Sequence, residues 1–189
     1  MFGVNTHMEW KNMKNSKGFT LIEVIIVVAL IGIMAAISIP AISSWLPNYR
    51  LKAAARELYS DMQKIKLEAI KKNTNVGIAF ITVVFPATGG SYQAFVDDGA
   101  GGGISGNLVQ DGAEETLFRT TMPASCSLTS ANFSSNSAAG YGPRGLPLRS
   151  WFGSAVLRND RSKWYKLSLS IAGSTKIEIS SDGSAGSWN

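Results

Sequence analysis

An apolar stretch of 21 residues near the start of the chain, Phe19 to Ile39, constrains the fold more than any other feature. Seventeen of these residues are Ala, Val, Ile, Leu, Met or Phe, and the one ionisable side chain is that of Glu23. As an α-helix rising about 1.5 Å per residue, the stretch would be about 31 Å long, which matches the hydrocarbon core of a bilayer, about 30 Å thick. The sequence therefore predicts a membrane-spanning helix with one carboxylate close to its start.

Glu23 is unusual in this position, because an acid inside a transmembrane helix costs about 3 kcal/mol. A positively charged partner would offset that cost. The nearest candidate is the α-amino group that cleavage between Gly18 and Phe19 would create, in the same subunit or in a neighbour. The alternative is that Glu23 lies near the membrane interface and reaches water, as charges near helix ends often do. The sequence leaves both explanations open.

Gly18, Phe19 and Glu23 resemble the class III signal of type IV pilins and type II secretion pseudopilins. In that family a short basic leader ends in Gly, a prepilin peptidase cuts after it and N-methylates the new first residue, and a Glu follows at the fifth mature position. Gly32 and Pro40 are similar to a helix-loosening Gly and Pro of the same segment. An ordinary secretory signal would instead place its cleavage site after the apolar run. The resemblance implies cleavage after Gly18, N-methylation of Phe19, and assembly roles for Glu23, Gly32 and Pro40.

Lysines at positions 11, 14 and 17 precede the span and place the leader in the cytoplasm by the positive-inside rule. We expect four segments: a cytoplasmic leader removed by prepilin peptidase (1–18), a transmembrane and filament-core helix (19–41), its amphipathic continuation (42–73) and a β-rich extracytoplasmic head (74–189). Met13 would give a leader of the usual length for the family, so translation is expected to start there or at Met8. The expected location is the bacterial inner membrane, as a single-pass protein, and then a pilus or pseudopilus.

After Pro40 the apolar residues recur at steps of four and three, which is the spacing of one helix face. They are Leu51, Ala55, Leu58, Met62, Ile65 and Ala69. Proline can kink a helix without ending it. We therefore expect one long helix from about Phe19 to Lys72, broken by Asn73-Thr74-Asn75.

The rest of the chain predicts antiparallel strands. β-Branched and aromatic runs bounded by turn residues are Val76–Val84, Ser91–Val96, Thr116–Thr120, Trp151–Leu157, Lys163–Ile171 and Thr175–Ser180. Residues 123–140 are rich in Ser, Ala and Asn, show no period, and are expected to form a surface loop. The fold class is α+β, with one antiparallel sheet covering the amphipathic half of the helix. This order is similar to that of the GspH/FimT group of minor pilins and pseudopilins.

Few residues in the head offer catalytic chemistry. The single histidine, His7, lies in the leader, so a mature chain has no His-dependent triad and no His metal site. Cys126 has no partner for an intramolecular disulfide and is expected to be buried as a small apolar residue, the alternatives being a reactive thiol or an intersubunit bridge. Many major pilins carry a C-terminal disulfide loop, so the resemblance implies a minor pilin or pseudopilin. We expect no enzymatic activity and no cofactor. The expected partners are other pilins, the prepilin peptidase/N-methyltransferase and inner-membrane lipid.

A Gly-rich acidic segment follows the second expected strand. Asp97, Asp98 and Asp111, with Glu114 and Glu115, could supply oxygen ligands to calcium or could lie in a solvated loop. The run Gly101–Gly106 matches a dinucleotide-binding pattern in letters only, because its context offers no βαβ unit and its acids would repel phosphate. A loop is expected there.

Six basic residues are interleaved with aromatic residues in the second half of the head: Arg144, Arg149, Arg158, Arg161, Lys163 and Lys166. Proteins that bind single-stranded nucleic acid contact its phosphates with basic side chains and stack aromatic rings on its bases. The alternative function is therefore a DNA-binding minor pilin acting in DNA uptake. An ordinary solvated face or a subunit contact would have the same composition, and the tail lacks the Gly-Arg pair that the resemblance associates with DNA receptors.

Overall fold

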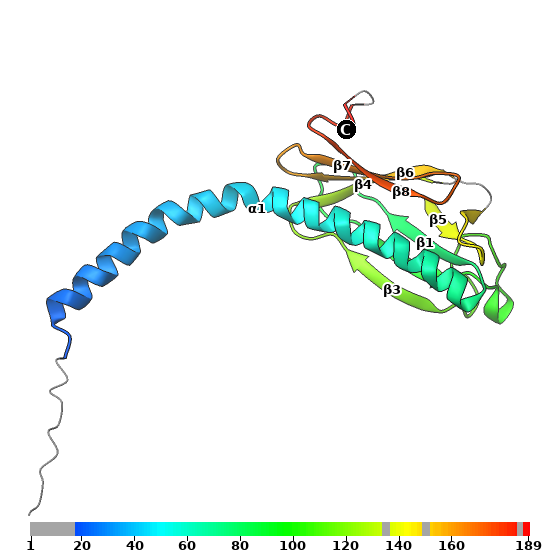
Figure 1. Ribbon diagram of the computed structural model, residues 1–189, viewed down its shortest axis with the longest axis horizontal. Helices are drawn as coiled ribbons and strands as arrows, with labels where there is room; N and C mark the ends of the chain where they lie inside the picture. The colour runs from blue at the N-terminus through cyan, green and yellow to red at the C-terminus, as the bar shows by residue number, and fades with distance from the viewer. Residues whose placement is uncertain (1–17, 134–136, 149–151, 185–186) are drawn as a thin grey trace, which may run out of the picture. The chain divides into compact units, whose positions relative to one another are not determined.

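The computed structural model describes residues 18–133, 137–148, 152–184 and 187–189 (Figure 1). The chain divides into two compact units, residues 1–42 and 43–189, and we call the second unit the head. One α-helix, α1 (Leu21–Lys72), contributes to both units. Within it, an 18-residue window has a mean hydropathy of 2.8 and no buried residue, so α1 is long and apolar enough to cross a membrane. Residues 1–17 of the predicted leader, with Met8 and Met13, lie outside the described residues.

The end of α1 is fixed by a left-handed residue. Asn73 has φ 51°, and its N–H donates to the carbonyl of Ile70 while the N–H of Thr74 donates to the carbonyl of Ala69. This pair of hydrogen bonds is a Schellman motif, in which Asn is the commonest substitute for glycine. The predicted break at residues 73–75 is confirmed.

The head has one hydrophobic core around the second half of α1. The six apolar residues of the predicted stripe are all at most 1% exposed. Five of them, all except Ala55, belong to one core cluster with side chains from the strands, the largest fully buried ones being Tyr92 and Tyr141. The helix-spaced pattern therefore predicted the buried face of α1 correctly.

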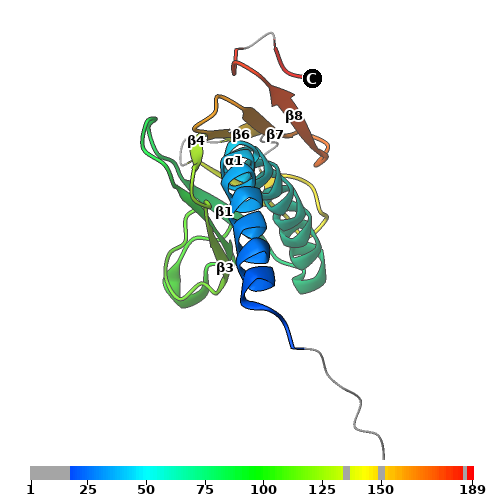
Figure 2. The same cartoon turned by 90° about the vertical axis from the view of Figure 1, so that its left-hand side faces the viewer.

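The head contains two four-stranded antiparallel sheets, where one sheet was expected (Figures 1 and 2). The first sheet has the order β3-β2-β1-β5, formed by β3 (Thr116–Thr121), β2 (Ser91–Val96), β1 (Val76–Ile81) and β5 (Ala138–Tyr141). The second has the order β4-β6-β7-β8, formed by β4 (Cys126–Asn132), β6 (Gly153–Asn159), β7 (Trp164–Leu169) and β8 (Thr175–Ser180). The single-sheet prediction is wrong because β4 pairs with β6 rather than with β3, which follows β2 in the other sheet.

The expected surface loop at residues 123–140 is also wrong, since β4 and β5 both lie in it. The register of β4 shifts between Leu128 and Ser130, which is a β-bulge. Before the bulge Cys126 and Leu128 are buried, and after it Ala131 and Phe133 are buried. The extra residue inverts the alternation halfway along the strand, so no period of two is visible in the sequence.

Two loops protect the edges of the second sheet. The β1–β2 loop, residues 82–90, runs along β4: the N–H of Val83 donates to Leu128, and Gly89 exchanges backbone hydrogen bonds with Cys126 and Leu128. On the opposite edge, Ile179 of β8 pairs with Asn189, which lies beyond the strand. Each residue donates its backbone N–H to the carbonyl of the other. Both edges are thus partly paired within the chain.

Candidate functional site

The start of α1 holds the residues of the expected processing and assembly site. Thr20 precedes the helix, and its Oγ1 accepts a hydrogen bond of 3.3 Å from the backbone N–H of Glu23, whose N–H also approaches the Thr20 carbonyl at 3.1 Å. Thr20 is therefore the N-cap and Glu23 the third residue of the first turn. A Thr-x-x-Glu pattern is the signature of a capping box. A carboxylate in this turn is stabilised by the positive end of the helix dipole.

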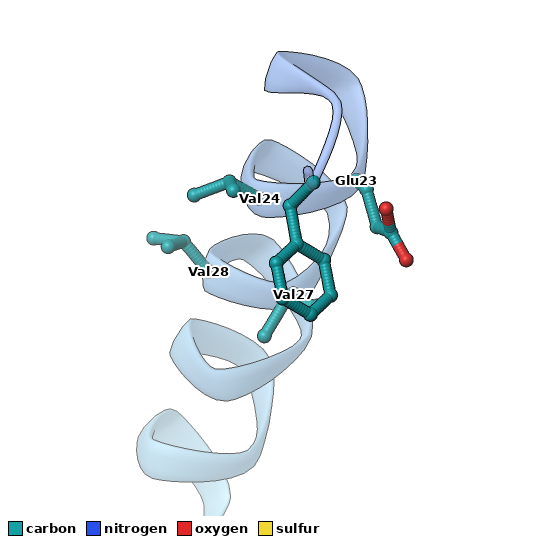
Figure 3. A pocket seen from close by; sticks show the side chains of 5 residues that line it. Glu23, Val24, Val27 and Val28 are labelled. Atoms are coloured by element: carbon teal, nitrogen blue, oxygen red, sulfur yellow. The ribbon is translucent and has the colours of Figure 1, made fainter. Parts of the chain in front are cut away.

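Glu23 lies in a shallow recess on the outer surface of α1 (Figure 3). The recess is lined by Phe19, Glu23, Val24, Val27 and Val28. The Glu23 carboxylate projects outward, away from Val24 and Val28 (Figure 3). Within the part of the chain that the structure describes, no residue gives this carboxylate a hydrogen bond or an ion pair. It is an acid presented to the surroundings from an otherwise apolar helix face.

The other expected residues of this segment lie as follows. Gly18 is exposed and precedes α1, and a Cβ built on it meets no atom within 4 Å. Gly32 lies within α1 and has equally open space around it. Pro40 also lies within α1, which continues through it to Lys72. Proline offers no N–H to the preceding turn, so Pro40, like Pro47 further along α1, removes one hydrogen bond from the helix ladder.

The acidic loop is organised around buried carboxylates. Asp97 is 0% exposed, and its two carboxylate oxygens accept the backbone N–H groups of Gly106 at 2.6 Å and Leu108 at 2.9 Å. Glu114 is 8% exposed and accepts the N–H groups of Gly99 and Asp111. The expectation of a fully solvated loop is therefore wrong for these two acids, because the loop backbone needs acceptors inside its fold.

Asp98 and Asp111 also bond within the loop. Asp98 is exposed and accepts the N–H of Ala100, and Asp111 accepts the N–H of Ile104 and the amide of Asn107. No group of three His, Cys, Asp or Glu residues suited to a metal ion occurs among the described residues. Burial raises the pKa of the Asp97 carboxyl, while the N–H donors of Leu108 and Gly106 oppose the rise. The geometry is that of a loop held by carboxylate-to-backbone hydrogen bonds.

The glycine run in this loop forms a single 3₁₀ turn, Ala100–Gly102, and no α-helix follows it. The expected loop is confirmed. Cys126 is 0% exposed, as expected, and burial raises the pKa of its thiol to about 11.

The basic candidates for nucleic-acid contact are divided between two ends of the head. Arg144 follows β5 and lies in a cleft lined also by Asn75, at the C-terminal end of α1. Arg161 and Lys163 are exposed in the β6–β7 turn, where Asn159 hydrogen-bonds Asn48. Between position 48 and the end of α1 at Lys72 there are 24 helical residues, which span about 36 Å at 1.5 Å per residue. Positions 48 and 75 therefore lie near opposite ends of the part of α1 that belongs to the head. The basic residues therefore do not form one continuous patch.

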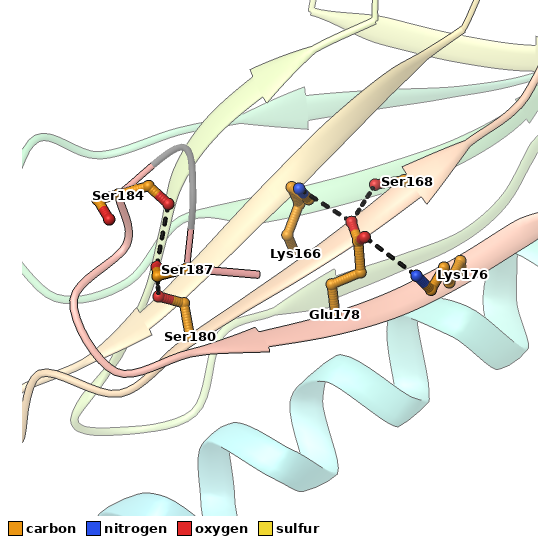
Figure 4. A network of polar contacts seen from close by, with 7 residues as sticks. All are labelled: Lys166, Ser168, Lys176, Glu178, Ser180, Ser184 and Ser187. Carbon is orange, nitrogen blue, oxygen red and sulfur yellow. Dashed lines mark hydrogen bonds and ion pairs between the residues drawn. The ribbon is translucent and has the colours of Figure 1, made fainter. Parts of the chain in front are cut away.

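Two of the remaining candidates have partners inside the head. The Arg158 guanidinium carbon lies 3.5 Å from the centre of the Phe85 ring and 4.7 Å from that of Trp164. Lys166 forms an ion pair of 2.9 Å with Glu178. Figure 4 shows that the same carboxylate also accepts a hydrogen bond from Ser168 and forms an ion pair with Lys176. Arg149 lies outside the described residues.

Sequence reasoning missed two features of these sites. The Thr-x-x-Glu pattern at Thr20 and Glu23 is visible in the letters and could have predicted the Thr20 cap, whose Oγ1 accepts the backbone N–H of Glu23. The burial of Asp97 has a weaker signal: an acid at the end of a strand, followed by a Gly-rich loop with many N–H groups to satisfy.

Comparisons with known proteins agree with this arrangement. A family model described as a prokaryotic N-terminal methylation motif matches residues 13–39, and the model of type II transport protein GspH matches residues 54–184. The chain is 35% identical over 85 residues to the pilin-like protein PilA1 of Thermus thermophilus, covering 44% of this chain and 50% of PilA1. It is 35% identical over 102 residues to a fimbrial protein of Pseudomonas aeruginosa, covering 49% of this chain and 66% of that protein. The chain thus spans about half to two thirds of these relatives.

Two solved structures show a partial likeness to this chain. The type IV minor pilin FimU of Pseudomonas aeruginosa has a TM-score of 0.46 and 15% identity, with 69% of this chain and 90% of FimU covered. The minor pseudopilin EpsH of the Vibrio cholerae type 2 secretion system has a TM-score of 0.46 and 11% identity, with 68% and 95% covered. The GspH model covers more than half of the chain, and the methylation motif covers the start of α1. The chain therefore belongs to the type II transport protein GspH family, a family of pilin and pseudopilin structural subunits.

Proposed function

We propose that this protein is a minor pilin or pseudopilin, a structural subunit of a type IV pilus or a type II secretion pseudopilus. Prepilin peptidase cuts the precursor after Gly18 and methylates the new amino group of Phe19. Before assembly α1 spans the inner membrane, with the head on the extracytoplasmic side. During assembly the apolar part of α1 leaves the lipid and packs among the corresponding helices of other subunits.

The observation that carries this proposal is the Glu23 carboxylate, which projects from an apolar helix face and has no partner among the residues that the structure describes. Cleavage would create a positive amine on Phe19, four residues away and next to the Thr20 cap. The amine of a neighbouring subunit can reach a projecting carboxylate, and pairing neutralises both charges as the subunit leaves the membrane. Glu23 would thus help to select the docking register of a new subunit.

Gly32 and Pro40 support the same step. Glycine has the lowest helix propensity after proline, and proline removes one backbone hydrogen bond. We propose that the helix bends or partly unwinds between them when it exchanges lipid for protein neighbours.

The test is Glu23→Ala in the organism that assembles the filament. The variant should be cleaved and membrane-bound as normal, because neither step needs the carboxylate, but it should be depleted from sheared filaments. Glu57→Ala is the matched control, an exposed acid on the same helix within the head, and it should assemble normally. Gly18→Val should leave a larger, unprocessed form. Normal incorporation of Glu23→Ala would refute the pairing mechanism.

A further inference from the structure

The end of the head at which the chain enters it has a composition of its own. We define this entry end as residues 43–52 of α1, the β1–β2 loop (82–90) and the β6–β7 turn (160–163). Asn159 donates a hydrogen bond of 2.8 Å to Asn48, which holds the turn beside α1. Phe85 lies against Arg158, which brings the β1–β2 loop to the same end. Three separate segments therefore meet there.

The entry end must lie close to the end of the span. Asn48 is six residues beyond Ile42, about 9 Å of helix. The headgroup layer on each side of a bilayer is about 5–8 Å thick, from the difference between the full thickness and the hydrocarbon core. Chain connectivity alone thus keeps the start of the entry end, residues 43–48, within or just beyond the headgroup layer for as long as the span is in the membrane.

Large apolar and aromatic side chains are exposed at this end. Val84 is 87% exposed at the tip of the β1–β2 loop, and Phe85 beside it is 43% exposed. On α1, Trp45 and Tyr49 are 51% and 62% exposed and stack edge to face at 5.9 Å. Trp and Tyr favour the interface between lipid and water, where an apolar ring body and a polar atom are both satisfied.

Basic residues lie in the same segments of the entry end. Arg161 and Lys163 are exposed in the turn, Lys52 is exposed on α1, and Arg50, also on α1, is half-buried. The acid of the turn, Asp160, is also exposed, which leaves an excess of positive charge.

The opposite end of the head is acidic. It holds the loop from Asp97 to Glu115, and Glu115 reaches Lys72 at the end of α1 with an ion pair of 2.7 Å. The head is therefore polarised along its part of α1, with an excess of basic charge at the end where the chain enters it and the acidic loop at the end where α1 stops. A basic surface close to a membrane is attracted by anionic lipid, at roughly a fivefold change in affinity for each Lys or Arg.

We infer that the entry end docks on the anionic headgroup surface of the bilayer that holds the span, before the subunit joins a filament. The inference rests on the proposed membrane-inserted state. Phosphate is shared by lipids and nucleic acids, but two observations favour lipid. Arg158 stands over the rings of Phe85 and Trp164, so these faces are occupied rather than open to stacking bases. Val84 is aliphatic and suits the boundary of the acyl chains.

Docking would give the subunit a fixed height and would restrict rotation of the head. Val84 and the Trp45–Tyr49 pair enter the interface, while Arg161 and Lys163 bind lipid phosphates. Release of these contacts then becomes part of the extraction of a subunit from the membrane.

The experiment uses the full chain reconstituted in vesicles of phosphatidylcholine, with and without phosphatidylglycerol. Val84→Cys carries an environment-sensitive fluorophore, and the buried Cys126 remains unlabelled. With phosphatidylglycerol, emission from Val84→Cys should shift to the blue and be quenched by spin-labelled lipid. The matched control is Ile104→Cys, which is 65% exposed in the acidic loop at the opposite end and should stay aqueous.

The charge test is the double variant Arg161→Glu, Lys163→Glu in the Val84→Cys background. It should lower the ratio of docked to undocked probe about 25-fold or more, fivefold for each cation removed. Lys71→Glu with Arg144→Glu, two exposed cations at the other end of the head, should leave the ratio unchanged.

Three results would overturn the inference: an aqueous Val84 probe in phosphatidylglycerol vesicles, equal quenching without phosphatidylglycerol, or equal quenching in the double variant. If the double variant abolishes a gel shift with single-stranded DNA while lipid quenching is unchanged, the entry end is a nucleic-acid surface instead. Flotation of the vesicles separates these outcomes from failure of the proposed function, since a chain that does not float with lipid refutes membrane insertion itself.

Discussion

Substitution of Asp97 should destabilise the head strongly although the residue lies in a loop. Asp97→Ala removes the acceptor of the backbone N–H groups of Gly106 and Leu108, which approach the carboxylate at 2.6 and 2.9 Å. A buried donor left without an acceptor costs about 1–3 kcal/mol. Two such donors, partly rehydrated when the loop loosens, give an expected loss of about 3 kcal/mol.

The assay is thermal unfolding of the full chain in detergent, followed by the circular dichroism of the sheets. For a unit of this size, 1 kcal/mol corresponds to about 2–4 °C, so the midpoint should fall by about 6–12 °C. Asp98→Ala is the matched control, because Asp98 is exposed and accepts one N–H, that of Ala100. It should change the free energy of unfolding by less than about 1 kcal/mol. Equal effects of the two substitutions would refute the role assigned to Asp97.

The same carboxylate has a defined pH signature. Burial raises the pKa of Asp97 above its ordinary value of 3.8. The folded head therefore holds this proton to a higher pH than the unfolded chain does, and its stability falls as the pH rises through that window. Asp97→Asn should remove this part of the pH dependence. The addition of calcium should not raise the midpoint of the wild type, because the loop backbone already uses the acceptors of Asp97.

Two further predictions concern the second sheet. Hydrogen bonds from Lys166 first, and then from Lys176 and Ser168, lower the pKa of Glu178 from 4.5 to about 2, so the stabilisation by this carboxylate is present above pH 4.5 and is lost as the pH falls toward 2. Acid titration should show a difference in the free energy of unfolding of at most about 1 kcal/mol between the wild type and Glu178→Gln, because Lys176 is exposed. A stability difference that grows as the pH falls would contradict the ion pair. The Cys126 thiol, with a pKa of about 11, should not react with a thiol reagent at pH 8 until the head unfolds, and rapid labelling of the native chain would show that β4 opens.

The helix and most strands could be predicted because their side chains report burial with a regular period. The stripe from Leu51 to Ala69 follows helix spacing throughout, and β2 and β8 begin and end at the predicted residues. The period of two fails at β4. Up to Leu128 the even-numbered apolar residues are buried, and after the bulge the buried apolar residue is the odd-numbered Ala131. A local insertion of this kind depends on the partner strand β6, which lies more than 20 residues away and cannot be read from the segment itself.

The two groups of candidate site residues differ for a similar reason. Gly18, Phe19 and Glu23 lie within six consecutive positions, so their spacing is fixed by one helix start and is visible in the sequence. The surroundings of Asp97 are made by the fold of its own loop, and those of Arg158 by a segment distant in the chain. Asp97 gained a structural role because the loop folds back on it, and Arg158 is covered by Phe85, which comes 73 positions earlier. Contacts of this kind become visible only when the sheets are assembled.

The pairing of Asn189 with Ile179 has a consequence for crowding. In a filament of the proposed kind, the heads of neighbouring subunits would lie at high local concentration, and an open strand edge would allow backbone pairing between them. Part of the β8 edge is closed by the chain itself, and Lys176 and Glu178 lie on the same strand, so the head resists strand pairing with its neighbours.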